Sequence, residues 1–221
     1  MTSVEDGETY YKSFINHQKS GYEITAKMIG YIVERMIQEK IITADIQITG
    51  RIKSYHSVYE NSNKKSVDDC FGIRIVGKRE DLLEIEKQLE KILVIDRTKD
   101  HRKKKKKYNA VHQMVHMKKQ YAEGNGLDYN LFPLIEVQYW DMDLEQLCTT
   151  GELSYANYKQ SDFKRICKQY LENPESVLEE MPIYYEIKGN NIRMLSKRET
   201  LYKLYPEIKE KDVEQKDDVE K

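Results

Sequence analysis

The spacing of apolar residues predicts helices and strands interleaved along most of the chain. Residues 8–20 carry a weak helical pattern, and residues 21–40 repeat apolar positions at clear helical spacing. Residues 79–93 predict a strongly amphipathic helix, and residues 143–171 a mostly helical segment. Alternating or β-branched runs predict strands at 44–50, 68–77, 94–98, 108–117 and 134–140.

Capping and turn residues mark where several of these elements begin or end. The strand at 44–50 is expected to stop at a turn at Gly50, and Ser54 is a suitable N-cap for a short helix over 54–61. The glycines within residues 121–130 predict a turn region. Asn173 followed by Pro174 predicts a capped helix start.

The order of these elements predicts the fold class. Helices come first, strands with interposed helices follow, and helices return, which is typical of an α+β domain with a small mixed sheet flanked by helices. We expect a single domain over residues 1–221. It would have a helical lead at 8–40, C-terminal helices at 161–206 and a charged tail at 207–221.

Composition limits the kinds of partner. Lys plus Arg total 37 and Asp plus Glu total 38, so the chain is not a bulk polycation and any affinity for phosphate must come from local clustering. One such cluster is residues 97–107, with eight basic residues and one acid. Six consecutive basic residues occupy 102–107, and they suit a solvated face, a nucleic-acid contact or one wall of a nucleotide site.

Nothing in the chain predicts a membrane segment or a disulfide framework. No apolar run approaches the roughly 20 residues that span a bilayer, and the N-terminus has no signal-peptide pattern. The three cysteines lie far apart without a CxxC motif, as expected in a reducing compartment. We therefore expect a cytoplasmic protein.

Two acidic positions are candidates for metal or proton chemistry. Glu136 lies inside the apolar run LIEVQYW, where a carboxylate is costly unless it is paired or binds a metal, and Gln138 shares its strand face. Asp69 opens the strand FGIRIV. Two carboxylates on neighbouring strands can hold Mg²⁺ over a nucleotide triphosphate. The alternative is that Glu136 faces solvent from a half-exposed strand.

Basic and aromatic residues near the same strands form a second set of candidates. The run GRIKS places Arg51 and Lys53 on one face after the expected Gly turn, and Arg74 lies among apolar residues. Guanidinium groups bind phosphate oxygens in a bidentate manner, although an ordinary ion pair is the alternative. Tyr108 and His112 share a strand face, where the tyrosine could stack on a base or lie at the edge of the core. No P-loop, GxGxxG or HExxH motif is present.

Taken in order, five short motifs carry a family resemblance. GRIKSYHSVYE, DDCFGIRI, YNAVH, FPLIEVQ and GELSYANYK resemble the GRxKxxxS, DxxGxR, YxSxH, EVQ and HWxYK motifs of the RelA/SpoT synthetase domain, over a core of about residues 44–160. Each motif is weak alone, and their order is what makes the match specific. The chain resembles the small, single-domain alarmone synthetases.

The resemblance implies a nucleotidyltransferase-like fold and an ATP-dependent pyrophosphokinase that transfers pyrophosphate from ATP to the 3′-hydroxyl of GTP or GDP. It implies that Asp69 and Glu136 bind Mg²⁺, with Glu136 also the general base. The implied nucleotide-binding residues are Arg51, Lys53, Ser57, Arg74, Tyr108, His112 and Gln138. Within this set, Arg51 and Arg74 would hold ATP, Lys53 and Ser57 would contact phosphates, and Tyr108 would stack on the acceptor guanine.

The motifs on the acceptor side depart from the family pattern. The usual PKxNGYxSxH loop reads KKKKKYNAVH here, Trp140 and Asp141 replace Arg-Thr after EVQ, and YANYK replaces HWxYK. Three hypotheses follow: synthesis of (p)ppGpp, toxic pyrophosphorylation of the 3′ end of tRNA, or a nucleotide-binding module without activity. An antitoxin protein and a homo-oligomer are further expected partners that the sequence leaves open.

Overall fold

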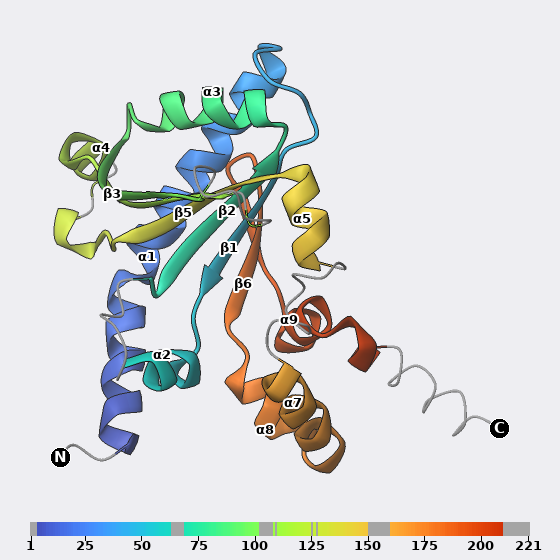
Figure 1. Cartoon of the computed structure of the whole chain (residues 1–221). Helices are drawn as coiled ribbons and strands as arrows, with labels where there is room; N and C mark the ends of the chain where they lie inside the picture. The colour runs from blue at the N-terminus through green and yellow to red at the C-terminus, as the bar shows by residue number, and fades with distance from the viewer. Residues whose placement is uncertain are drawn as a thin grey trace.

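The computed structural model of the chain describes residues 4–62, 69–101, 108, 110–124, 126, 128–149 and 160–209 (Figure 1). Its helices are α1 (Val4–Gln38), α2 (Tyr55–Ser62), α3 (Arg79–Leu89), α4 (Lys119–Gly124), the 3-10 helix η2 (Tyr129–Leu131), α5 (Met142–Thr149), α7 (Gln160–Glu172), α8 (Pro174–Glu180) and α9 (Lys197–Leu204). Its strands are β1 (Gln47–Ile52), β2 (Phe71–Gly77), β3 (Leu93–Asp100), β4 (Ala110–Met117), β5 (Ile135–Asp141), β6 (Ile183–Lys188) and β7 (Asn191–Met194). None of the described helices is long and apolar enough to cross a membrane.

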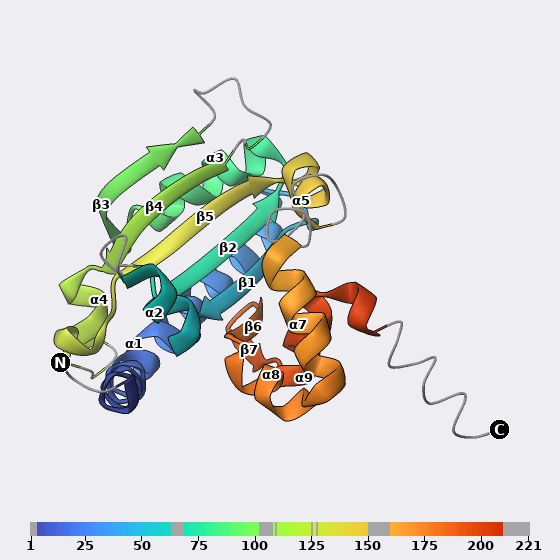
Figure 2. The ribbon, with the colours of Figure 1, turned by 60° about the horizontal axis from the view of Figure 1, so that its bottom comes forward.

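The described strands form one mixed sheet in the order β3-β4-β5-β2-β1-β6-β7 (Figure 2). Only β2 and β5 pair in parallel, and the other neighbours are antiparallel. A parallel pair needs a long crossover, which here contains α3, β3 and β4. The predicted α+β fold with a mixed sheet flanked by helices is confirmed.

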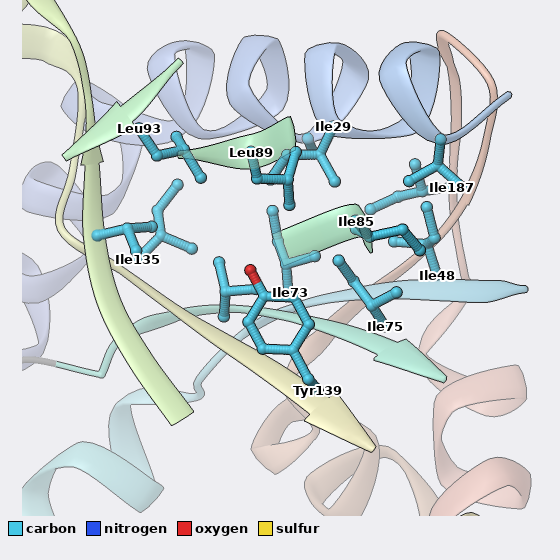
Figure 3. Packing of buried hydrophobic residues seen from close by; sticks show 14 of the residues in the cluster. Ile29, Ile48, Ile73, Ile75, Ile85, Leu89, Leu93, Ile135, Tyr139 and Ile187 are labelled. Carbon is cyan, nitrogen blue, oxygen red and sulfur yellow. The ribbon is translucent and has the colours of Figure 1, made fainter. Parts of the chain in front are cut away.

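Helices α1 and α3 cover one face of the sheet (Figure 2) and bury its apolar residues. Ile29 of α1 and Ile85 of α3 pack with Ile73, Ile75 and Ile135 of the central strands (Figure 3), and each of the five is at most 1% exposed. Burying one such side chain contributes about 1.5–3 kcal/mol. Because side chains alternate along a strand, the residues between these isoleucines point to the opposite face of the sheet.

Helix α1 runs without interruption through the position where the sequence pattern predicts a change from a weak to a clear helix. A side chain at Gly21 would collide with the backbone of Leu131 and Phe132. The glycine therefore allows α1 to pack closely on the η2 segment, and this packing gain exceeds the roughly 1 kcal/mol by which Gly disfavours a helix.

The turn expected at Gly50 is wrong, because β1 continues through Gly50 to Ile52. Gly50 pairs with Ile73 on one side and Tyr185 on the other. A Cβ at Gly50 would overlap the hydroxyl of Tyr22, which donates a hydrogen bond to the carbonyl oxygen of Gly72 at 2.9 Å. The residue thus serves close packing under α1 and not a reversal of the chain.

Replacing Gly50 with Ala should lower the free energy of unfolding by about 1–3 kcal/mol, the typical cost of overpacking a core. The added methyl would force Tyr22 away from its acceptor in β2. Urea unfolding of the variant measures the loss. Gly124 provides a control, because a Cβ there meets no atom within 4 Å. Equal stability of the Gly50 variant and wild type would contradict this role.

The prediction that residues 161–206 are all helical is wrong between Ile183 and Met194. This segment is the β6–β7 hairpin, and β6 pairs with β1 in the sheet. The capped start at Asn173 is confirmed, since its Oδ1 accepts from the amide of Ser176 at 3.3 Å. The surrounding helices bury a small cluster of their own, made of Ile166, Tyr170, Val177, Met181, Leu201, Tyr205 and Ile208.

One further segment differs from the sequence pattern, and one short helix matches it. The turn region predicted at 121–130 contains the end of α4 and the start of η2, whose N-cap Asp128 accepts from the amide of Asn130 at 2.9 Å. The short helix predicted after Ser54 is confirmed as α2. Residues 102–107, the YANYK motif at 155–159 and the tail from 210 onward lie outside the described residues.

Candidate active site on the open face of the sheet

Polar side chains from the candidate motifs gather on the face of the sheet opposite α1 and α3. Arg74 of β2 lies directly beside Gln138 of β5, which lies directly beside His112 of β4. Two residues earlier on β5 and β2, Glu136 lies beside Gly72, and Gly72 lies beside Arg51 of β1. The strand order therefore brings residues from four motifs, far apart in sequence, into two adjacent rows.

A continuous chain of hydrogen bonds joins these rows. The hydroxyl of Tyr108 contacts Nε2 of His112 at 2.7 Å, and Nδ1 of His112 contacts Oε1 of Glu136 at 3.0 Å. Nε2 of Gln138 donates to Oε2 of Glu136 at 2.7 Å. Nε of Arg74 donates to Oε1 of Gln138 at 3.1 Å. Both oxygens of Glu136 thus have partners, and the rotamers along the chain hold one another in place.

Glu136 is a shielded carboxylate whose side chain is 13% exposed, so it does not face solvent. Burial alone raises the pKa of Glu136, but the hydrogen bond and charge of His112, the amide of Gln138 and the charge of Arg51 outweigh it. Together they lower the pKa of Glu136 to about 2. The group is ionised at neutral pH and carries its charge near the guanidinium of Arg51.

This lowered pKa predicts an acid-dependent loss of stability. A carboxylate with a folded-state pKa of about 2 and an ordinary value of 4.5 stabilises the fold above pH 4.5, and the contribution disappears as the pH falls toward 2. The full contribution is about 3 kcal/mol. Chemical unfolding of wild type and Glu136→Gln between pH 7 and pH 3 should show a steeper decline for wild type. Parallel curves would show that Glu136 gains nothing from its partners.

Arg51 lies close to both candidate carboxylates, Glu136 and Asp69. Its guanidinium lies beside Gly72, with Nε 3.9 Å from the position that a Cβ would take there. Burial lowers the pKa of Arg51, but the oxygens of Tyr184, Glu136 and Asp69 outweigh burial and raise the pKa. Arg51 therefore stays charged between Glu136 and Asp69.

Lys53 and Asp69 form an ion pair where β1 ends and β2 begins, and the amide of Lys53 donates to the carbonyl of Cys70 at 2.9 Å. The side chain of Lys53 is 17% exposed and that of Asp69 is 37% exposed. Ser57, in the first turn of α2, contributes its amide to Oγ of Ser54 at 3.4 Å, as expected for the predicted N-cap. This end of the sheet thus carries a cation and a carboxylate that solvent can reach.

The donor set tests whether Mg²⁺ fits. Asp69 and Glu136 both offer hard carboxylate oxygens near Arg51, and Mg²⁺ in nucleotide enzymes takes one or two carboxylates and completes its shell with phosphates and water. Within the described part of the chain, no cluster of three acidic, His or Cys side chains is arranged to hold a metal alone. The residues fit a magnesium ion that binds together with a nucleotide, whose phosphates would supply further ligands.

Aromatic side chains line the β4 end of the hydrogen-bonded chain. The ring of His101, just after β3, meets Tyr108 and His112 edge-on with centroids 5.3 and 5.1 Å away. Burial raises the pKa of Tyr108 to about 12, so its hydroxyl keeps its proton. His101 and Tyr108, which flank the basic run in sequence, therefore both lie at this site.

Several residues of the site escape the sequence patterns. A hollow beside Arg74 is lined by Thr49, Arg51, Gly72, Ile73, Arg74, Gln138 and Tyr184. The sequence patterns do not identify Tyr184, because its segment is predicted to be helical. The alternation in IYYEIK followed by GNN is nevertheless a hairpin signal. Trp140 stood out only as a departure from the family motif. No local pattern identifies Thr49.

Comparison with known proteins identifies the fold. No protein-family model matches the sequence, and no curated protein matches it. The structure of small alarmone synthetase 1 from Bacillus subtilis bound to its product pppGpp matches at 19% identity with a TM-score of 0.52, over 78% of this chain and 94% of that chain. A GTP pyrophosphokinase family protein from Streptococcus pneumoniae matches at 20% identity with a TM-score of 0.52, over 77% and 90%. The chain has the fold of the small alarmone synthetases, as its motifs predict.

Proposed function

We propose that the protein is an ATP-dependent pyrophosphokinase that makes (p)ppGpp from GTP or GDP. The proposal rests on one observation: on a fold shared with small alarmone synthetases, Glu136 is ionised and fixed by His112 and Gln138 on the same sheet face as two arginines. Transfer of a phosphoryl-type group depends mainly on positioning and charge neutralisation, which this set of residues can supply.

The donor ATP would bind where the positive charge is concentrated. The hollow between Arg51 and Arg74 offers guanidinium groups to phosphate oxygens and a planar surface to the adenine. Lys53 and Ser57 stand at the end of β1 and the start of α2, where they would contact the phosphates. Phosphates entering there would compete with Asp69 for Lys53 and release that carboxylate.

Asp69 and Glu136 would hold the magnesium ion that accompanies ATP. The ion would offset charge that develops on the transferred phosphates. Arg51, held close to both carboxylates, would offset part of their negative charge before the ion arrives. In this arrangement the protein orients two oxygen ligands and leaves the remaining positions to the substrate.

The acceptor guanine would stack on Tyr108, which places the ribose near His112 and Glu136. The 3′-oxygen attacks the β-phosphorus of ATP, the bond from that phosphorus to the α–β bridging oxygen breaks, and AMP leaves with the oxygen. The 3′-hydroxyl proton passes to Glu136. Its low pKa makes it a weak base, which suits a loose transition state in which the hydroxyl loses its proton late.

Labelled ATP provides the direct test. The protein is incubated with Mg²⁺, γ-labelled ATP and either GTP, GDP or total tRNA, and the labelled product and released AMP are followed. Label on the guanine nucleotide with stoichiometric AMP supports the proposal. Label only on tRNA would assign the toxic acceptor instead, and label on neither would favour a nucleotide-binding module. An antitoxin or a second copy of the chain as partner is tested by co-purification.

A further inference from the structure

Trp140 contacts two residues of the candidate site, although it occupies a position where the family pattern has another residue. Its ring carries the guanidinium of Arg74, whose Cζ is 3.5 Å from the ring centroid. Arg74 is also held by its hydrogen bond to Gln138. One face and one edge of this guanidinium therefore have partners, and Arg74 also lines the hollow that Arg51 lines, whereas Trp140 does not.

The same indole contacts Tyr108, the residue proposed to stack on the acceptor guanine. Tyr108 meets it edge-to-face, with centroids 5.9 Å apart and an interplanar angle of 87°. Trp140 is 6% exposed and packs with Val76, Ala110 and Leu144 beneath α5. A buried and tightly packed indole is rigid. Arg74 and Tyr108 both contact it, so it fixes their positions relative to each other.

We propose that Trp140 is a positioning residue that sets the spacing between the donor base and the acceptor base. Adenine stacks on the face of Arg74 that Trp140 does not cover, and the acceptor base stacks on Tyr108. This inference rests on the proposed function for the assignment of the two bases. It adds that the indole, which touches neither substrate, determines how well both are held.

Two substitutions separate the aromatic role from packing. Trp140→Phe keeps a π-face for Arg74 and an aromatic partner for Tyr108, whereas Trp140→Leu keeps only apolar volume. Thermal unfolding of both variants reports any loss of packing separately.

We expect Trp140→Leu to raise KM for both ATP and the acceptor by about tenfold, because a desolvated cation–π contact has about that effect on binding, while kcat falls less. Trp140→Phe should recover most of the loss. A lower melting temperature with both KM values unchanged would overturn the proposal, since Trp140 would then only fill space. Equal KM values for the Phe and Leu variants would also overturn it.

A binding experiment tests the inference without turnover. Trp140 is the only tryptophan in the chain, so its fluorescence reports on this position alone. An ATP analogue with a methylene group between the α- and β-phosphorus cannot be cleaved at the bond in question. Saturable change in fluorescence on adding it, reduced in Arg74→Lys, supports the role of Trp140 even if no acceptor takes pyrophosphate. Analogue binding by calorimetry with unchanged fluorescence would overturn it and leave the proposed function intact.

Discussion

Glu136→Gln should abolish pyrophosphate transfer, with kcat reduced by at least about 10²–10⁴-fold, the usual contribution of a positioned general base. The amide has nearly the same shape but cannot take the 3′-hydroxyl proton, and it is a poor ligand for Mg²⁺. It also removes the negative charge that His112 and Arg51 face. The rate of AMP release from labelled ATP in the presence of the acceptor measures the effect.

A matched control is available on the same sheet. Glu186 of β6 pairs with Arg193 at 2.8 Å on the surface, outside the hydrogen-bonded chain of Glu136. Glu186→Gln should leave kcat and KM close to wild type, because exposed ion pairs contribute little. The loss of activity in Glu136→Gln should be the same with GTP, GDP or tRNA as the acceptor. Full activity of this variant would contradict the proposed mechanism.

Asp69→Asn should weaken the use of magnesium, with a loss in activity at least as large as the roughly 10–100-fold seen when a supporting group of a metal site is removed. Asp69 offers one of the two hard oxygen donors proposed for the ion, and it is the ion-pair partner of Lys53. Titrating Mg²⁺ at saturating ATP should give a higher half-maximal concentration for the variant, with part of the activity recovered at high Mg²⁺.

The chain contains a second lysine–aspartate pair for comparison. Asp45 pairs with Lys78 at 3.4 Å on the surface, and both side chains are about half exposed. Asp45→Asn removes the same kind of charge, so an unchanged Mg²⁺ titration is expected. If Asp69→Asn lowers kcat but leaves the Mg²⁺ dependence unchanged, Asp69 acts through Lys53 and does not bind the ion.

Local sequence patterns predicted much of the secondary structure and several residues of the candidate site. Periodicity predicted most helices and the five strands up to β5, and alternation in LIEVQYW placed Glu136 and Gln138 on one face, where a 2.7 Å hydrogen bond joins them. The order of the short motifs indicated the fold that the comparisons identify. These features depend on residues a few positions apart, so a sequence pattern can carry them.

Errors arose where long-range packing overrode local signals. Gly50 has the composition of a turn but lies inside β1, because the hydroxyl of Tyr22 needs the space that a side chain would fill. The hairpin of β6 and β7 was missed, although it pairs with β1 and places Tyr184 beside Arg51. In both cases the deciding contact comes from a residue 28 or more positions away in the chain.

The amino-acid sequence alone determined the chemistry available to this protein: two carboxylates, two guanidinium groups, a tyrosine and a histidine in or beside the predicted strands. Only the tertiary structure decided which of them act together. The strand order β4-β5-β2-β1 brings His112, Glu136, Gln138 and Arg74 into one hydrogen-bonded network. It also places Trp140, which the sequence shows only as a departure from a motif, in contact with Arg74 and Tyr108. Strand neighbours are set by the burial of a whole sheet face under α1 and α3, a global property that no short segment encodes.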